Sequence, residues 1–188
     1  MQPGGLDTPY AMPEDPLMRI RLAGTIVALT LALPAVAMAQ AARVVAHPDP
    51  ESLFTDPDPR LHANKQVVMH IVRDLLEANH WADAPKYLTA EYIQHNPLVA
   101  SGLDPVMKFF GGRTPTPIPA RNAWKTPVVS VTAEDDRVVV AFVREFPDPR
   151  NPGQTYTTTW FDMWRIKDGK ADEHWDPQTI AAPAAPAR

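Results

Sequence analysis

The chain has 188 residues, of which 45% are hydrophobic and 21% charged, so its composition is that of a globular protein and excludes wholesale disorder. A net charge of −4 gives no electrostatic case for a nucleic-acid partner. The absence of cysteine excludes disulfides, thiolate zinc sites and cysteine nucleophiles. Proline is unusually frequent, because 22 of the 188 residues are proline, more than twice the usual share of ~5%.

Residues 18–39 have the three parts of a secretory signal peptide. Arg19 and Arg21 give a positive start, residues 22–36 are almost all apolar, and Ala37-Met38-Ala39 forms a cleavage site of small residues. The apolar run is too short for the ~20 residues of a membrane span. We therefore expect a periplasmic or secreted protein with no stable membrane span after signal removal. Residues 1–17 would then be an upstream extension, with translation starting at Met18.

The mature chain is predicted to have an irregular segment at each end of one domain. Residues 40–62 contain HPDPESLFTDPDPR, where proline recurs too often for a helix or an inner strand, so we expect an extended arm. Residues 181–188, AAPAAPAR, are expected to form a flexible tail. The folded domain is therefore predicted to span residues 63–180.

Helices are predicted in the first half of this domain. Apolar residues between Val67 and Leu76 follow helical spacing, with Asn64 as a plausible N-cap. A second, short helix is expected over residues 82–88. Asp104-Pro105 suits the start of a third helix, which should stop at Gly111-Gly112.

Strands are predicted after residue 120. Four segments are rich in β-branched and aromatic residues: 124–133, 137–146, 154–166 and 170–179. The first and the last pair are joined by turn-forming residues, and the proline-rich residues 147–153 should form a loop between them. Helices followed by an antiparallel meander predict an α+β fold, in which helices cover one face of a curved antiparallel sheet.

The last predicted hairpin holds an unusual group of polar and aromatic side chains. If residues 167–169 form a three-residue loop with a left-handed Gly169, Ile166 faces Lys170, Asp162 faces His174 and Trp160 faces Asp176. These side chains and Trp164 then share one face. Two carboxylates and an imidazole on a concave, covered face would suit proton transfer. A two-residue loop would instead split the set across both faces.

A second candidate is the segment YIQHNP, in which Tyr92, His95 and Asn96 precede Pro97. These side chains either satisfy local backbone groups or line the mouth of a pocket. Likewise, Trp160 and Trp164 could be core residues and His174 a structural histidine. The residues alone leave both interpretations open.

Other reaction classes find no support in the sequence. The motifs GxSxG, GxxxxGK and GxGxxG are absent, which disfavours nucleophile-elbow hydrolases and nucleotide-dependent enzymes. The HxH and HExxH spacings are absent too, so we expect neither a metal nor a cofactor.

The motifs YIQHNP, SGLDPVMKFFGG and FDMWRIKDGKADEHWD together resemble the SnoaL-like polyketide cyclase family, and more narrowly its branch of predicted aldol-condensation enzymes. This family belongs to the nuclear transport factor 2-like superfamily, and the resemblance covers residues 63–180. It implies a cone of curved antiparallel sheet, closed by N-terminal helices around a pocket. It also implies a homodimer formed through the sheet, as relatives often do.

The resemblance also implies roles for the candidate residues. In cyclases of this family an Asp on the last strand is the general acid/base of an intramolecular aldol closure, and Asp176 matches it. The partner on the preceding strand is a His in those cyclases but Asp162 here. We therefore expect a cofactor-independent acid/base enzyme acting on a small apolar carbonyl compound, of aldol cyclase, isomerase or dehydratase type. Asp176, Asp162 and His174 would be catalytic, and the substrate would bind to Tyr92, His95, Asn96, Trp160 and Trp164. A non-catalytic binding module and a protein-interaction domain remain alternatives, since fold does not fix function.

Overall fold

The computed structural model describes residues 42–180. The predicted signal peptide (18–39), the upstream extension (1–17) and the tail (181–188) lie outside the described residues. Among residues 42–180, no helix combines the length and apolarity that a membrane crossing requires.

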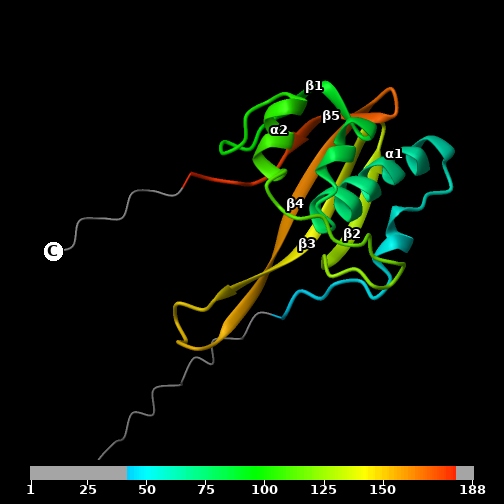
Figure 1. Cartoon of the computed structure of the whole chain (residues 1–188). Coiled ribbons are helices and arrows are strands. Elements are labelled where there is room, and N and C mark those ends of the chain that lie inside the picture. Colours follow the sequence, from blue (N-terminus) through cyan, green and yellow to red (C-terminus); the bar gives the residue numbers. More distant parts are fainter. Residues whose placement is uncertain (1–41, 181–188) are drawn as a thin grey trace, which may run out of the picture. The chain divides into compact units, whose positions relative to one another are not determined.

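A curved five-stranded sheet carries the fold (Figure 1). Its strands are β1 (Leu88–Gln94), β2 (Val128–Glu134), β3 (Arg137–Pro147), β4 (Thr155–Lys167) and β5 (Lys170–Trp175), in the spatial order β1-β5-β4-β3-β2. The four segments predicted as strands form β2 to β5 and pair antiparallel in sequence order, as expected. The domain is therefore α+β.

The expectation of a wholly antiparallel sheet is wrong at one edge. Strand β1, which was not predicted, pairs parallel with β5, so the sheet is mixed. The β1 sequence LTAEYIQ contains Ala90 and Glu91, which have low strand propensity, and its burial does not alternate cleanly. The pairing joins two segments about 80 residues apart, so no local pattern announces it.

Helices and helical turns cover one face of this sheet (Figure 1). They are η1 (Pro50–Phe54), α1 (Pro59–His70), the π-helical η2 (Ile71–Glu77), η3 (Trp81–Lys86) and α2 (Leu103–Phe110). The long helical run over α1 and η2 buries Val68, Val72 and Leu75 completely. These side chains belong to the same core cluster as Val138 and Val140 of β3.

The helical region begins earlier than predicted. Asp58, not Asn64, is the N-cap of α1, because its Oδ1 accepts hydrogen bonds from the backbone N–H groups of Arg60 and Leu61 at 2.8 and 3.1 Å. Pro59 then occupies the first helical turn, where its missing N–H costs nothing. The expected arm also contributes to the core, since Phe54 is fully buried and its ring lies 5.7 Å from that of Trp124.

The bounds of the two later helices differ from the prediction. The helix expected over residues 82–88 is the 3-10 helix η3, which contains Pro85 and ends before β1 starts at Leu88. Helix α2 is capped by Gly102, whose φ is 102°, rather than by Asp104. It ends at Phe110, before Gly111, as predicted.

Candidate active site

The register of the last hairpin differs from the prediction. Asp168 and Gly169 both have positive φ and form a two-residue turn, so Lys167 faces Lys170 and Ile166 faces Ala171. A β-bulge then shifts the register, and Trp164 faces His174. The expected pairs Ile166–Lys170 and Asp162–His174 are therefore wrong.

The bulge nevertheless brings the predicted side chains onto one face. Asp172 and Glu173 follow one another in β5 and both form ion pairs with Arg165, which shows that the extra residue lies here. A two-residue turn alone would have moved His174 to the opposite face from Asp162. The shift by one residue at the bulge restores His174 to the concave, helix-covered side of the sheet.

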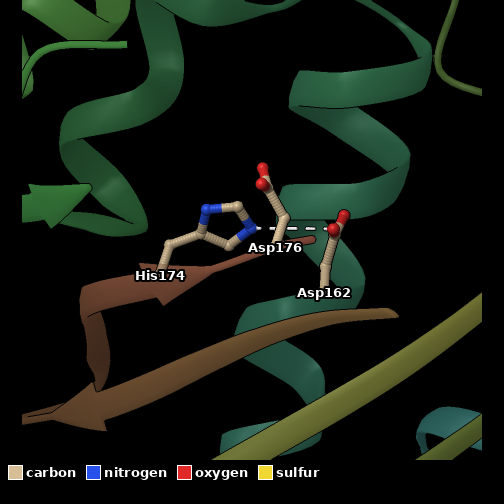
Figure 2. A group of neighbouring side chains, drawn as sticks. All are labelled: Asp162, His174 and Asp176. Carbon is tan, nitrogen blue, oxygen red and sulfur yellow. Dashed lines mark ion pairs between the residues drawn. The ribbon is translucent and has the colours of Figure 1, made fainter. Parts of the chain in front are cut away.

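Asp162, His174 and Asp176 meet on that side (Figure 2). One ligand-type atom of each lies within 4.8 Å of the others. Asp162 comes from the middle of β4, His174 from β5, and Asp176 from the residue directly after β5. The Nε2 atom of His174 lies 3.9 Å from Oδ1 of Asp162.

Hydrogen bonds fix the tautomer of His174. Its Nδ1 lies 2.6 Å from Oε1 of Gln94, which also accepts a hydrogen bond from the backbone N–H of Asn96 at 3.2 Å. An oxygen that accepts from a backbone N–H is a carbonyl oxygen, so Nδ1 of His174 must carry the proton. Nε2 therefore presents a lone pair, and it is buried with no hydrogen-bond partner among the described residues.

Burial shifts the pKa values of two of the three groups toward their neutral forms. It raises the pKa of Asp162 to about 7, against the opposing effect of the indole N–H of Trp160, which donates to Oδ1 at 2.7 Å. The negative charge of Asp176 adds to this rise. Burial lowers the pKa of His174 to about 4. Near neutral pH the imidazole is therefore neutral, and Asp162 exchanges readily between its two protonation states.

The third group, Asp176, is held by two donors. The side-chain amide of Asn96 donates to Oδ2 at 2.7 Å, and the backbone N–H of Gln178 donates to Oδ1 at 2.9 Å. Both oxygens thus accept hydrogen bonds, an arrangement that suits a carboxylate. Asn96 in turn is fixed by its own Oδ1, which accepts from the N–H of Leu98.

A cavity of about 460 Å³ opens over the three residues. Tyr92, Asn96, Trp160 and Trp164, which were predicted to bind substrate, all line it. Burial raises the pKa of Tyr92, and the negative charges of Asp162 and Asp176 add to the rise, so its phenol remains a hydrogen-bond donor close to both carboxyls. Ile71, Leu76, Leu88, Phe110 and Phe142 supply apolar wall.

His95 does not line this cavity, and its expected position at the pocket is wrong. Its Nε2 lies 2.7 Å from Oε1 of Glu173, and its ring stacks on Trp175 at 5.0 Å. Glu173 and Trp175 flank His174 in β5, and Glu173 forms its ion pair with Arg165 on the side opposite the cavity. The side chain of His95 is 44% exposed there.

Five polar residues of the cavity were not predicted: Gln94, Arg113, Thr126, Arg144 and Gln178. Gln94 lies in the motif YIQHNP, but its contact with His174 depends on the unpredicted β1. The position of Arg144 could have been predicted from the sequence. The alternation of β3 places it on the same face as Val140 and Phe142, four and two residues earlier.

The same donor set could hold a divalent cation. A neutral imidazole with a free Nε2 and two carboxylates is a combination that binds Zn²⁺ or Mn²⁺. The oxygens that would bind the cation already accept hydrogen bonds from Trp160, Asn96 and Gln178, which would remain as supports for the ligands.

Three solved structures illustrate how this chain compares with others. A Jannaschia sp. CCS1 protein assigned as a SnoaL-like polyketide cyclase is 20% identical, with a TM-score of 0.45 over 65% of this chain and 91% of that one. TsrD from Streptomyces laurentii is 19% identical, with a TM-score of 0.41 over 64% and 90%. An LEH-like epoxide hydrolase of M. tuberculosis is 11% identical, with a TM-score of 0.43 over 61% and 76%.

No protein with a curated description matches the sequence. A model of the SnoaL-like domain does match it, over residues 68–174. This range covers more than half of the chain and includes the last three residues of α1, the whole sheet except the end of β5, and both Asp162 and His174. The family match and the α+β fold agree with the resemblance seen in the sequence motifs. The chain belongs to the SnoaL-like domain family.

Proposed function

We propose that this protein is a cofactor-independent enzyme that moves a proton on a small carbonyl compound. The observation that carries the proposal is the carboxyl of Asp162, which lines the cavity, has a pKa raised by burial to about 7 and lies 3.9 Å from the neutral imidazole of His174. A general acid/base works best when its pKa lies near the working pH. Asp162 therefore replaces Asp176 as the principal acid/base in our proposal.

Asp162 would carry the proton in this reaction. Ionised Asp162 removes a proton from the carbon next to the carbonyl group, and the electron pair of the C–H bond moves into an enolate. The phenol of Tyr92 donates a hydrogen bond to the enolate oxygen. Protonated Asp162 then returns the proton to carbon, which gives an isomerisation. In an aldol closure the enolate carbon instead forms a C–C bond to a second carbonyl group of the substrate, whose π electrons move onto its oxygen, and Asp162 gives its proton to that alkoxide. Protons and electrons balance without any further reactant.

The other two polar residues would orient the reaction. The lone pair on Nε2 of His174 accepts a hydrogen bond from a substrate hydroxyl, and Gln94 holds the imidazole in this tautomer. Burial, with a smaller contribution from the charge of Asp176, keeps the pKa of Asp162 high enough for it to act as an acid as well as a base. Trp160 and Trp164 provide an apolar wall for the rest of the substrate.

Exchange of carbon-bound hydrogen tests this function directly. A panel of enolisable ketones and aldehydes would be incubated with the protein in D₂O, and loss of the α-proton signal followed by ¹H NMR. We expect exchange catalysed by the wild type and abolished by Asp162→Asn. Asp168→Asn is the matched control, because it makes the same change at an exposed turn residue of the same hairpin, where Asn also tolerates positive φ.

The same experiment separates the enzyme from a binding module. A compound that binds in the cavity but exchanges no faster than in buffer, for the whole panel, would support the non-catalytic alternative. Equal exchange by wild type and Asp162→Asn would contradict the role of Asp162.

We also propose that the protein acts outside the cytoplasm, because residues 18–39 have the charge, length and cleavage site of a signal peptide. Expression of the full chain, cell fractionation and N-terminal sequencing test this proposal. We expect a periplasmic or secreted product beginning at Gln40. Size-exclusion chromatography with light scattering on that product tests the expected homodimer.

A further inference from the structure

The arginines of the described residues fall into two groups. Residues 42–180 contain nine of them. Seven form ion pairs with aspartate or glutamate side chains: Arg43, Arg60, Arg73, Arg121, Arg137, Arg150 and Arg165. The remaining two, Arg113 and Arg144, have neither an ion pair nor a side-chain hydrogen bond within the described part of the chain, and both line the cavity.

The surroundings of Arg144 hold its guanidinium in place without using its donors. It lies 5.0 Å from the ring centroid of Trp160, at cation–π distance. A guanidinium that stacks on an indole keeps the N–H groups along its edge available, and these match the two oxygens of a carboxylate. Trp160 therefore positions the guanidinium of Arg144, and no carboxylate of the described residues pairs with it.

The same indole connects Arg144 to the reacting group. Trp160 donates its N–H to Oδ1 of Asp162 at 2.7 Å, while its ring carries Arg144. One indole ring thus contacts both the guanidinium of Arg144 and the carboxyl of Asp162. Arg113, which follows α2 in the chain, adds a second positive charge to the lining of the cavity.

We propose that the substrate carries a carboxylate, which Arg144 binds with help from Arg113, while its carbonyl group lies at Asp162. This inference rests on the proposed function and narrows its substrate class from an apolar carbonyl compound to an oxo acid. The apolar part between the two groups lies against Trp160 and Trp164. The carboxylate supplies the ion-pair partner that Arg113 and Arg144 lack and that the other seven described arginines already have.

A matched pair of probes tests the proposal by binding alone. The first is 4-oxo-4-phenylbutanoate, a ketone with a carboxylate two carbons away, and the second is its uncharged amide, which has the same shape. Dissociation constants would be measured by isothermal titration calorimetry at pH 7.5 and low salt. We expect the acid to bind at least ~10-fold more tightly than the amide, since charge-assisted hydrogen bonds of this kind are among the strong ones.

Variants of the two cavity arginines test whether the preference for the acid over the amide arises in the cavity. Arg144→Gln should abolish this preference for the acid over the amide, and Arg113→Gln should reduce it. Arg144→Lys, which keeps the charge but loses the guanidinium, should restore part of it. Arg137→Gln is the matched control, because it removes the same charge from the same strand at a residue outside the cavity and should change neither affinity.

Three results would overturn the inference. The wild type could bind acid and amide with equal affinity, or show no binding of the acid up to 20 mM, roughly the limit of a specific site. The third is an equal loss of affinity for the acid in Arg137→Gln and Arg144→Gln. The proposed function fails separately. If Asp162→Asn keeps the preference for the acid while the wild type exchanges no α-protons, the carboxylate subsite stands without the catalysis. If the wild type exchanges protons of acid and amide with the same KM, the catalysis stands without the subsite.

Discussion

The Nε2 atom of His174 lies 3.9 Å from Oδ1 of Asp162, and the two side chains have opposite responses to burial. Burial makes the carboxyl harder to ionise and the imidazole harder to protonate. Near pH 7 the pair therefore consists of a neutral base and an acid close to its midpoint.

The pH dependence of stability should reveal these two opposing groups. Between about pH 4 and 7 the folded state keeps a proton on Asp162 that the unfolded state has lost, so this residue makes stability fall as pH rises. Between about pH 4 and 6.5 the unfolded state protonates His174 and the folded state does not, so this residue makes stability rise with pH. The two contributions, each on the order of 3 kcal/mol, should largely cancel in the wild type.

Urea denaturation at pH 4.5, 5.5 and 6.5 separates them. Stability of Asp162→Asn should rise across this range, because only the histidine contribution remains. Stability of His174→Asn, whose amide can still donate to Gln94, should fall. Parallel curves for wild type and both variants would show that the two groups are not buried as described.

Substitution of Trp160 by Phe should raise the pKa of Asp162 further. The indole N–H stabilises the ionised carboxyl, and Phe keeps an aromatic ring but has no donor. We expect the acid/base pKa in the pH–rate profile of the proposed reaction, and in the NMR titration of Asp162, to move above about 7. Trp164→Phe changes the other indole of the cavity wall and serves as the control. A pKa of Asp162 that stays constant or falls in Trp160→Phe would contradict the hydrogen bond.

Gln94→Glu should convert His174 into a cation. A carboxylate in place of the amide stabilises a proton on both ring nitrogens, so the pKa of His174 should rise from about 4. Long-range ¹H–¹⁵N NMR checks the state of the ring, and in the wild type it should show the proton on Nδ1 at pH 7. Gln178→Glu places the same charge elsewhere in the cavity and should raise the pKa much less. Equal effects of the two variants would mean that the contact with Gln94 does not set the tautomer.

The segment before α1 should prove to be part of the folded domain. Phe54→Ala removes a fully buried ring and should destabilise the protein by about 3–5 kcal/mol. Val45→Ala, in the same segment but 75% exposed, should cost less than about 0.5 kcal/mol. Chemical denaturation of both variants measures this difference. Equal stability of Phe54→Ala and wild type would mean that this segment does not pack against the domain.

The sequence was sufficient to predict the helices after residue 63, four of the strands and the α+β fold, because each depends on local patterns of residues. It did not predict η1, which lies within the expected extended arm. It was not sufficient for β1, whose parallel pairing with β5 joins segments distant in the chain. Helix α1 was misplaced because Asp58-Pro59 was counted with the proline-rich residues, although Asp104-Pro105 was interpreted as a helix start.

The predicted grouping of Asp162, His174 and Asp176 on one face was correct for a reason that was only partly right. The turn has two residues rather than three, and the bulge at Asp172 supplies the missing shift. Two consecutive charged residues, Asp172 and Glu173, were a visible sign of such a bulge, because strict alternation would have placed them on opposite faces. His95 could not be placed from the sequence, since its side depends on the unpredicted β1.

The central claim is that Asp162 is a buried acid/base with a pKa near neutrality. A ¹³C NMR titration of the side-chain carboxyls tests it most directly, with Asp162→Asn to assign the signal and Asp176→Asn to remove the neighbouring charge. We predict one carboxyl that titrates at about pH 7, disappears in Asp162→Asn and titrates at lower pH in Asp176→Asn. If every carboxyl of the wild type titrates below about pH 5, near the ordinary range for Asp and Glu, the account of this site is contradicted.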